Sequence, residues 1–160
     1  RFAKDTKVKL ALSLNATTEE GRLKLMPITR KYTLERVIEA CRKYAVASKN
    51  RVTLEYVMMA GVNDSMEDAK RLARIGSHIP CKINLIPYNE YPTSPYKRPS
   101  EEGLRTFFKY LADRNFQVNI RYSKGLDVLA ACWQLATSCS PTVTDQEDIS
   151  SKSSMTRDAR

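Results

Sequence analysis

Strand-like and helix-like segments alternate along most of this chain, and that alternation constrains the fold more than any other feature. Segments whose apolar residues predict strands occupy residues 7–14, 51–59, 81–87 and 117–122. Thr33, Ser65 and Ser100 stand where helices between these strands would be capped, and Glu101 and Glu102 favour the start of the third helix. Four strands separated by helices indicate βαβ units and a parallel sheet. The expected fold is therefore α/β, either an open wound sheet or part of a (β/α) barrel.

The three predicted helices each carry apolar residues at helical spacing, which predicts one buried face per helix. These residues are Leu34, Val37, Ile38, Cys41 and Tyr44 in the first helix, Met66, Ala69, Leu72 and Ala73 in the second, and Leu104, Phe107, Phe108 and Leu111 in the third. Residues 125–136 are also helix-like. From residue 138 the composition turns polar, so we expect a folded core over 1–137 and a disordered tail over 138–160.

The chain is basic, with a formal net charge of +9. The segment 138–160 contains four acidic and three basic residues, so the positive charge belongs to the predicted core. Such a surface suits a polyanionic partner such as nucleic acid, although a merely well-solvated basic surface fits equally. There is no run of 18 apolar residues, so we expect no membrane span.

The cysteines give no sign of a local metal site. Cys41, Cys81, Cys132 and Cys139 include no pair with C-x-x-C spacing, and the single histidine, His78, has no cysteine near it in the sequence. A zinc or iron–sulfur site built from this chain is therefore not expected. Four cysteines in 160 residues are also no disulfide scaffold, so a reducing cytoplasm is the expected compartment.

Clusters that contain polar residues follow each predicted strand where it ends. They are Ser13, Leu14 and Asn15 after the first strand, residues 61–64 after the second, Asn89 and a long loop after the third, and Lys124, Gly125 and eventually Cys132 after the fourth. The carboxyl edge of a parallel sheet is where barrels and wound sheets bind ligands. Four clusters on this edge predict a ligand site there.

Each of these clusters has a purely structural alternative. Asn89 could serve only to stabilise a turn beside Pro87. Residues 63–65, Asn-Asp-Ser, could serve only as a turn and a helix cap. The loop after the third strand interleaves aromatic and basic residues that could either stack on RNA or pack the loop itself. They are Tyr88, Tyr91, Tyr96, Lys97 and Arg98.

Cys132 also has a structural alternative to a place in the ligand site. Val128, Cys132 and Leu135 share one helical face, so the residues alone favour a packed, inert thiol.

Several longer runs resemble a known family and occur in its order. They are residues 10–16 (LALSLNA), 26–32 (MPITRKY), 55–59 (EYVMM), 62–64 (VND), 81–89 (CKINLIPYN) and 130–132 (AAC). Together they resemble the C-terminal half of the RlmN/Cfr class of radical S-adenosylmethionine RNA methyltransferases. The resemblance covers residues 7–136, and the run 81–87 is closer to the RlmN branch.

The resemblance implies a fold and a chemistry. The fold would be the C-terminal part of a radical-SAM partial (β/α) barrel with parallel strands. In this family, one molecule of S-adenosylmethionine methylates a cysteine. A 4Fe-4S cluster then cleaves a second molecule of S-adenosylmethionine to a radical, which activates the S-methyl group for addition to adenine C2. RlmN-type enzymes act on large-subunit rRNA and on tRNA. The cofactors supply the difficult chemistry, and the protein positions the reacting atoms.

The resemblance also assigns roles to particular residues. Ser13, Leu14, Asn15 and Asn89 would contact S-adenosylmethionine. Cys132 would carry the methyl group, which reverses the inert reading given by the residues alone. Cys41 and Cys81 remain predicted core residues, and Cys139 a tail thiol.

The sequence departs from the family pattern in two ways. It lacks the cluster-binding C-x-x-x-C-x-x-C motif, the resolving cysteine and the N-terminal RNA-binding domain, so we expect these before Arg1, in a larger domain. Trp133 stands where the family usually has glycine, which would restrict motion beside Cys132. The expected protein is a cytoplasmic, monomeric enzyme. Another radical S-adenosylmethionine enzyme and a non-catalytic basic RNA-binding module are the alternatives.

Overall fold

A four-stranded parallel sheet forms the centre of the protein in the computed structural model, which describes residues 8–122. The strands are β1 (Ala11–Ser13), β2 (Val52–Met58), β3 (Cys81–Pro87) and β4 (Val118–Ile120). They lie in the order β1-β2-β3-β4, and each neighbouring pair is parallel. The predicted α/β class with parallel strands is confirmed.

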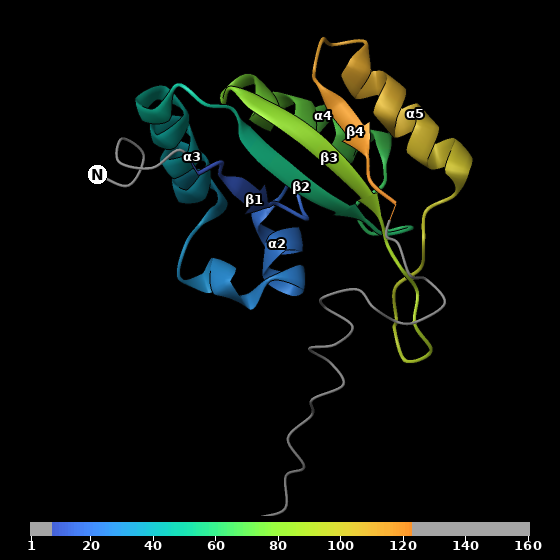
Figure 1. Cartoon of the computed structure of the whole chain (residues 1–160). Coiled ribbons are helices and arrows are strands. Elements are labelled where there is room, and N and C mark those ends of the chain that lie inside the picture. Colours follow the sequence, from blue (N-terminus) through green and yellow to red (C-terminus); the bar gives the residue numbers. More distant parts are fainter. Residues whose placement is uncertain (1–7, 123–160) are drawn as a thin grey trace, which may run out of the picture.

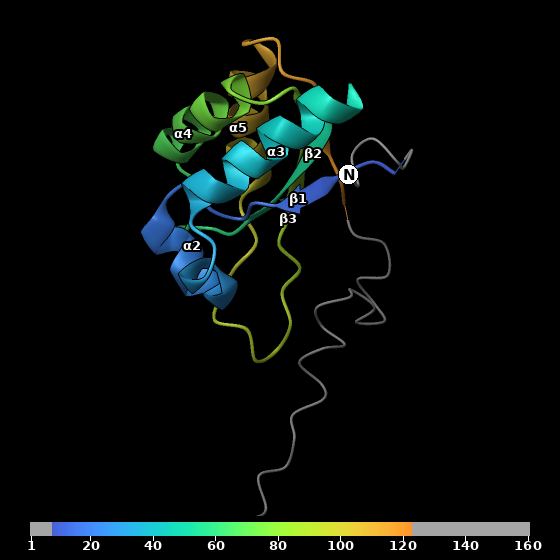
Figure 2. The same cartoon turned by 90° about the vertical axis from the view of Figure 1, so that its left-hand side faces the viewer.

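Three of the helices form a layer on one face of this sheet (Figures 1 and 2). The covering helices are α3 (Leu34–Ser48), α4 (Met66–Ser77) and α5 (Glu101–Ala112). The short helix α2 (Glu19–Leu25) and the 3-10 helix η1 (Pro27–Arg30) lie apart from that layer, near the carboxyl end of β1. The opposite face of the sheet carries no helix among the described residues.

The three predicted caps start the three covering helices. The hydroxyl of Thr33 accepts from Arg36 N at 3.4 Å, that of Ser65 from Asp68 N at 3.2 Å, and that of Ser100 from Gly103 N at 3.0 Å. Each bond satisfies one main-chain N–H that the helix itself leaves without a partner. The helix starts could therefore be predicted to the residue.

The core lies between the sheet and the helix layer. Alternate residues of β2 and β3 are buried against the helices, and the fully buried members include Leu54, Tyr56, Ile83 and Leu85. The Tyr56 ring stacks on Phe107 of α5 with centroids 5.8 Å apart. The predicted apolar faces of α3, α4 and α5 all belong to this core or pack against it.

The structure differs from the sequence prediction in two respects. The outer strands β1 and β4 are shorter than predicted, and Val8, within the predicted strand 7–14, precedes β1 and is 56% exposed. Each outer strand has a paired neighbour on only one side within the described residues, so fewer hydrogen bonds extend it. Helix α2 and η1 were not predicted, although Thr18 caps α2 by accepting from Gly21 N at 3.1 Å.

The predicted helix-like segment 125–136 and the predicted tail 138–160 lie outside the described residues. Within residues 8–122, none of the helices combines the length and the apolar character needed to span a bilayer.

Candidate functional site

The carboxyl ends of β1, β2 and β3 bring three of the four predicted polar clusters to one edge of the sheet. Ser13, Leu14 and Asn15 end β1, the turn before α4 follows β2, and Asn89 follows β3. Because β2 lies between β1 and β3, the first and third clusters are separated by two strand spacings, about 10 Å. The fourth cluster, which includes Cys132, lies outside the described residues.

Ser13, Leu14 and Asn15 differ in what they present to this edge. Ser13 is exposed on the helix-free face, where it pairs in register with Glu55. The Leu14 side chain is fully buried in the core, so only its main chain could touch a ligand. Asn15 adopts a left-handed backbone conformation with φ 53°, and its Oδ1 accepts from Val57 N at 3.2 Å.

The turn after β2 is built by Asn63, Asp64 and Ser65. Asn63 Oδ1 accepts from Met59 N at 2.7 Å, and Asp64 Oδ1 accepts from Gly61 N at 2.9 Å. Gly61 has φ 68°, a conformation that glycine adopts without strain. These residues do form a turn and a helix cap, and Asn63 in addition donates from Nδ2 to the main-chain oxygen of Asn15.

Asn89 holds the clearest vacant acceptor of the three clusters. It is 5% exposed, and its Oδ1 is buried with no hydrogen-bond partner among the described residues. A buried amide oxygen without a donor costs about 1–3 kcal/mol. A hydroxyl or amino group of a bound ligand would satisfy it, and S-adenosylmethionine offers both kinds of donor. This acceptor is thus compatible with S-adenosylmethionine, as with any ligand that carries such a donor.

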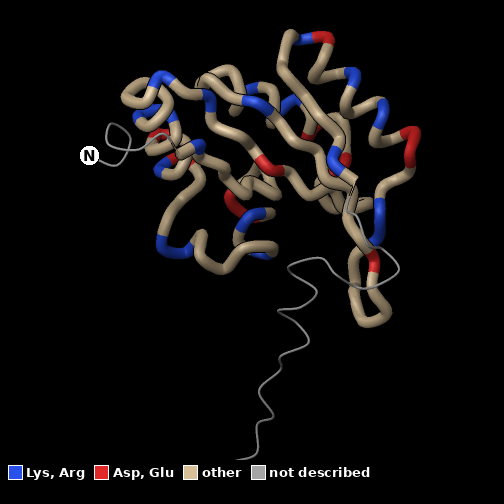
Figure 3. Tube along the Cα trace, in the orientation of Figure 1, with Lys and Arg blue, Asp and Glu red and all other residues tan. Residues whose placement is uncertain are grey.

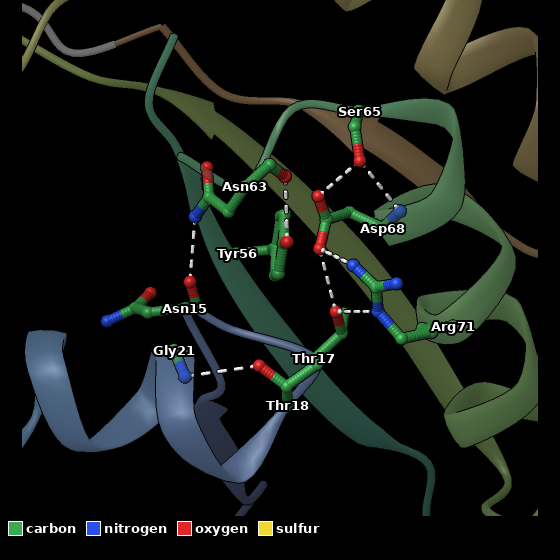
Figure 4. A network of polar contacts seen from close by, with 9 residues as sticks. All are labelled: Asn15, Thr17, Thr18, Gly21, Tyr56, Asn63, Ser65, Asp68 and Arg71. Atoms are coloured by element: carbon green, nitrogen blue, oxygen red, sulfur yellow. Dashed lines mark hydrogen bonds and ion pairs between the residues drawn. The ribbon is translucent and has the colours of Figure 1, made fainter. Parts of the chain in front are cut away.

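A polar network ties the segment after β1 to helix α4 (Figure 4). The hydroxyl of Thr17 donates to Asp68 Oδ1 at 2.9 Å and accepts from Arg71 Nε at 3.0 Å. Arg71 also pairs with Asp68 at 2.6 Å. Burial of Asp68 opposes its ionisation, but hydrogen bonds from Ser65, Arg71 and Thr17 outweigh burial and lower its pKa. This edge of the site is thus fixed by an ionised carboxylate.

Sequence reasoning missed Arg22, which lies in α2 and is only 3% exposed. Its Nη1 donates to the main-chain oxygen of Leu14 at 2.8 Å and to that of Ser13 at 3.2 Å. Burial lowers the pKa of this guanidinium. Nothing in the sequence marks this arginine, because its role depends on how α2 folds back beneath β1.

A polar row on the helix-free face was also missed. One residue from each strand lies in the same register, namely Ser13, Glu55, Asn84 and Asn119. Asn84 Nδ2 donates to Glu55 Oε1 at 2.9 Å, and Arg121 lies 3.6 Å from the same oxygen. The alternation of polar with apolar residues along these strands is the signal that predicts such a face. The row extends the site from Ser13 across the sheet.

The loop after β3 packs largely on itself. The rings of Tyr88 and Tyr96 meet edge to face at 5.9 Å. Lys97 pairs with Glu90 at 3.1 Å, and Arg98 pairs with Glu101 at 3.1 Å. These contacts favour the packing interpretation for Tyr88 and Tyr96, and they give both cations an intramolecular partner.

Lys and Arg positions are spread over the helices and loops (Figure 3). Beside η1, the exposed ring of Tyr32 lies close to two cations, 5.5 Å from Lys31 Nζ and 5.7 Å from Arg36 Cζ. Ile28, in η1, is 55% exposed. An exposed aromatic ring beside cations suits the stacking and charge of single-stranded nucleic acid. We define Ile28, Lys31, Tyr32 and Arg36 as the η1 patch.

The described cysteines are core residues, as predicted. Cys41 and Cys81 are buried, and burial raises the pKa of both thiols, that of Cys81 to about 11. Within residues 8–122 there is no group of three or more His, Cys, Asp or Glu side chains that could hold a metal ion. Cys139 lies outside the described residues.

Comparison with known proteins gives close relatives. No family model matches the chain. The dual-specificity RNA methyltransferase RlmN of Geobacter sulfurreducens is 47% identical over 135 residues, which are 84% of this chain and 38% of that protein. The protein of the same name from Anaeromyxobacter sp. is 49% identical over 141 residues, 88% of this chain and 37% of that protein. The chain thus spans little more than a third of the length of these relatives.

Two solved structures are also similar to this chain. A radical SAM methyltransferase from Sphaerobacter thermophilus superposes with a TM-score of 0.80 and 43% identity, over 84% of this chain and 40% of that one. A domain of pyruvate-formate lyase-activating enzyme from Bacteroides vulgatus superposes with a TM-score of 0.56 at 18% identity, over 70% of this chain and 66% of that one, which concerns the fold alone.

Proposed function

We propose that this chain, a relative of the RlmN-type radical S-adenosylmethionine RNA methyltransferases over most of its length, forms the C-terminal part of an enzyme that methylates C2 of an adenine in large-subunit rRNA and in tRNA. The similarity to proteins named dual-specificity RNA methyltransferase RlmN, at 47% to 49% identity, carries the proposal. We further propose that the complete enzyme is a cytoplasmic monomer.

The cofactors would be S-adenosylmethionine and a 4Fe-4S cluster, which supply a methyl group and radical chemistry when bound. Ser13, Leu14, Asn15 and Asn89 would hold S-adenosylmethionine at the carboxyl edge of the sheet. The buried Oδ1 of Asn89 supports this assignment, since it has no hydrogen-bond partner within residues 8–122 and needs a donor. The cluster ligands would come from outside this chain.

Cys132 would carry the methyl group to adenine. A thiolate is nucleophilic enough to accept a methyl group, and no other side chain of this chain has that role in the proposal. The two described cysteines are unsuited to it, because both are buried in the core with raised pKa values. An adenine must leave its stack to reach such a site, and basic and aromatic side chains near the edge would assist it.

The deciding experiment incubates the complete protein, reconstituted anaerobically with iron and sulfide, with S-adenosylmethionine, a reductant and two RNA substrates. These are a large-subunit rRNA fragment and a tRNA. We expect 2-methyladenine in digests of both RNAs by mass spectrometry. Deoxyadenosine without 2-methyladenine would indicate another radical S-adenosylmethionine enzyme. Salt-sensitive RNA binding without either product would indicate a non-catalytic RNA-binding module.

A further inference from the structure

We propose that Arg22 and Asn63 are positioning residues for S-adenosylmethionine, because they hold the main chain of residues 13–15 from two sides. The inference rests on the proposed function, since it concerns the segment that would bind this cofactor. Each of the three consecutive carbonyl groups of this segment accepts a hydrogen bond from a buried side chain of Arg22 or Asn63. Neither residue is itself placed in contact with the cofactor.

Arg22 holds the first two carbonyl groups. Its hydrogen-bond partners are the main-chain oxygens of Ser13 and Leu14, not carboxylates, and its Nε is buried without a partner among the described residues. A buried cation with incomplete hydrogen bonding is costly for a fold. An apolar residue of similar length would remove that cost but would also take a donor from the Ser13 and Leu14 oxygens, so the two effects on stability largely offset each other. Arg22 therefore contributes the conformation of this segment and little net stability.

Asn63 holds the third carbonyl group. Its Nδ2 donates to the main-chain oxygens of Asn15 and Val57, at 2.7 Å each. The side chain is almost wholly buried, and its Oδ1 is occupied by Met59 N. Asn63 thereby ties the end of β1 to the end of β2 and fixes the main chain beside Asn15, whose left-handed conformation asparagine adopts more readily than most residues other than glycine.

The hydrogen bonds from Arg22 and Asn63 should raise the affinity for the cofactor. A loop that is ordered before the ligand arrives loses less conformational entropy on binding, so it binds more tightly. Removing either donor frees a carbonyl group and lets the segment relax. The expected effect therefore falls on the affinity for S-adenosylmethionine and not on RNA binding, because neither Arg22 nor Asn63 belongs to the η1 patch.

The test compares Arg22→Met with wild type in the complete enzyme. S-adenosylhomocysteine serves as a non-reacting probe in equilibrium dialysis, and thermal unfolding is measured in parallel. We expect Kd for the probe to rise at least tenfold, while Tm changes little and RNA affinity stays the same. The matched control is Arg42→Met on the exposed face of α3, which should alter neither affinity nor Tm.

Asn63→Asp is the second variant, because it keeps the shape and replaces the donating amide by an acceptor. It too should raise Kd at least tenfold at a temperature where circular dichroism shows the folded state. An Arg22→Met variant with a lower Tm and wild-type affinity would overturn the inference and leave the proposed function standing. Failure of the wild-type enzyme to bind either S-adenosylmethionine or the probe would instead overturn the proposed function, and the inference with it.

Discussion

The hydroxyl of Thr17 donates to Asp68 Oδ1 at 2.9 Å and so joins the segment after β1 to a helix 51 residues later in the chain. Asp68 is nearly buried and also bonds with Ser65 and Arg71. Because these partners favour the ionised carboxylate, the hydrogen bond between Thr17 and Asp68 is charge-assisted. Its strength therefore depends on pH.

The first prediction concerns Asp68→Asn and acid stability. The pKa of Asp68 in the folded protein is lowered from its usual 3.8, so its ionised form contributes stability that is complete above about pH 4. That stability is lost as the pH falls through the folded-state pKa. Asp68→Asn should cost about 1–3 kcal/mol at pH 7. It should also show a smaller further loss than wild type between pH 5 and pH 2.

Urea unfolding at a series of pH values measures both effects. Glu67→Gln, an exposed neighbour on α4, is the control: its pKa is also lowered, by the hydrogen bond to Lys70, but solvent screens this exposed pair, so the pH dependence should change much less than in Asp68→Asn. Parallel curves for wild type and Asp68→Asn at every pH would contradict the prediction.

The second prediction concerns Asn89→Ala in the complete enzyme. Because the buried Oδ1 of Asn89 has no partner among the described residues, a ligand donor there should be worth about 1–3 kcal/mol of binding energy. The affinity for S-adenosylmethionine should fall accordingly, while RNA affinity changes little. Asn50→Ala, before β2, is the control. Equal cofactor affinity in wild type and Asn89→Ala would count against the assignment.

The third prediction places RNA binding on the η1 patch. Tyr32→Ala should weaken binding of a single-stranded RNA by about 1–3 kcal/mol through lost stacking. Lys31→Gln should reduce the salt dependence of binding, lowering the slope of log K against log salt by about one. Filter binding at several salt concentrations measures both. Val46→Ala, at an exposed site on α3, is the control. RNA affinities and slopes equal to wild type would exclude the η1 patch from the interface.

The covering helices could be predicted because their signals are local. Thr33, Ser65 and Ser100 cap helices through bonds to residues three positions on, and the apolar spacing that follows fixes the buried face. The order of β2, β3 and β4 follows from the same alternation, since consecutive parallel strands joined by helices usually lie side by side. Local chemistry was sufficient for these elements.

The role of Arg22 in holding the main chain of Ser13 and Leu14 could not be predicted, because it depends on contacts made only after folding. Its partners are main-chain oxygens, which carry no sequence signature. The short helix α2 was missed for a related reason, since it ends after two turns and has little apolar periodicity. The polar row through Glu55 and Asn84 also depends on strand register, although its alternation was visible in the sequence.

The last prediction concerns Cys132, which lies outside the described residues. Cys132→Ala in the complete enzyme should abolish adenine methylation and leave the fold intact. If Cys132 were a packed thiol, its loss would remove one sulfur atom, cost about 1 kcal/mol of stability and hardly touch catalysis. If it carries the methyl group, no other residue can replace it. Intact-mass analysis of wild type, expressed with its cofactors, should then show one added methyl group that peptide mapping assigns to Cys132. Cys41→Ala, a buried thiol in the core, is the matched control and should retain activity. Methylation by Cys132→Ala at a rate comparable to wild type would make Cys132 structural.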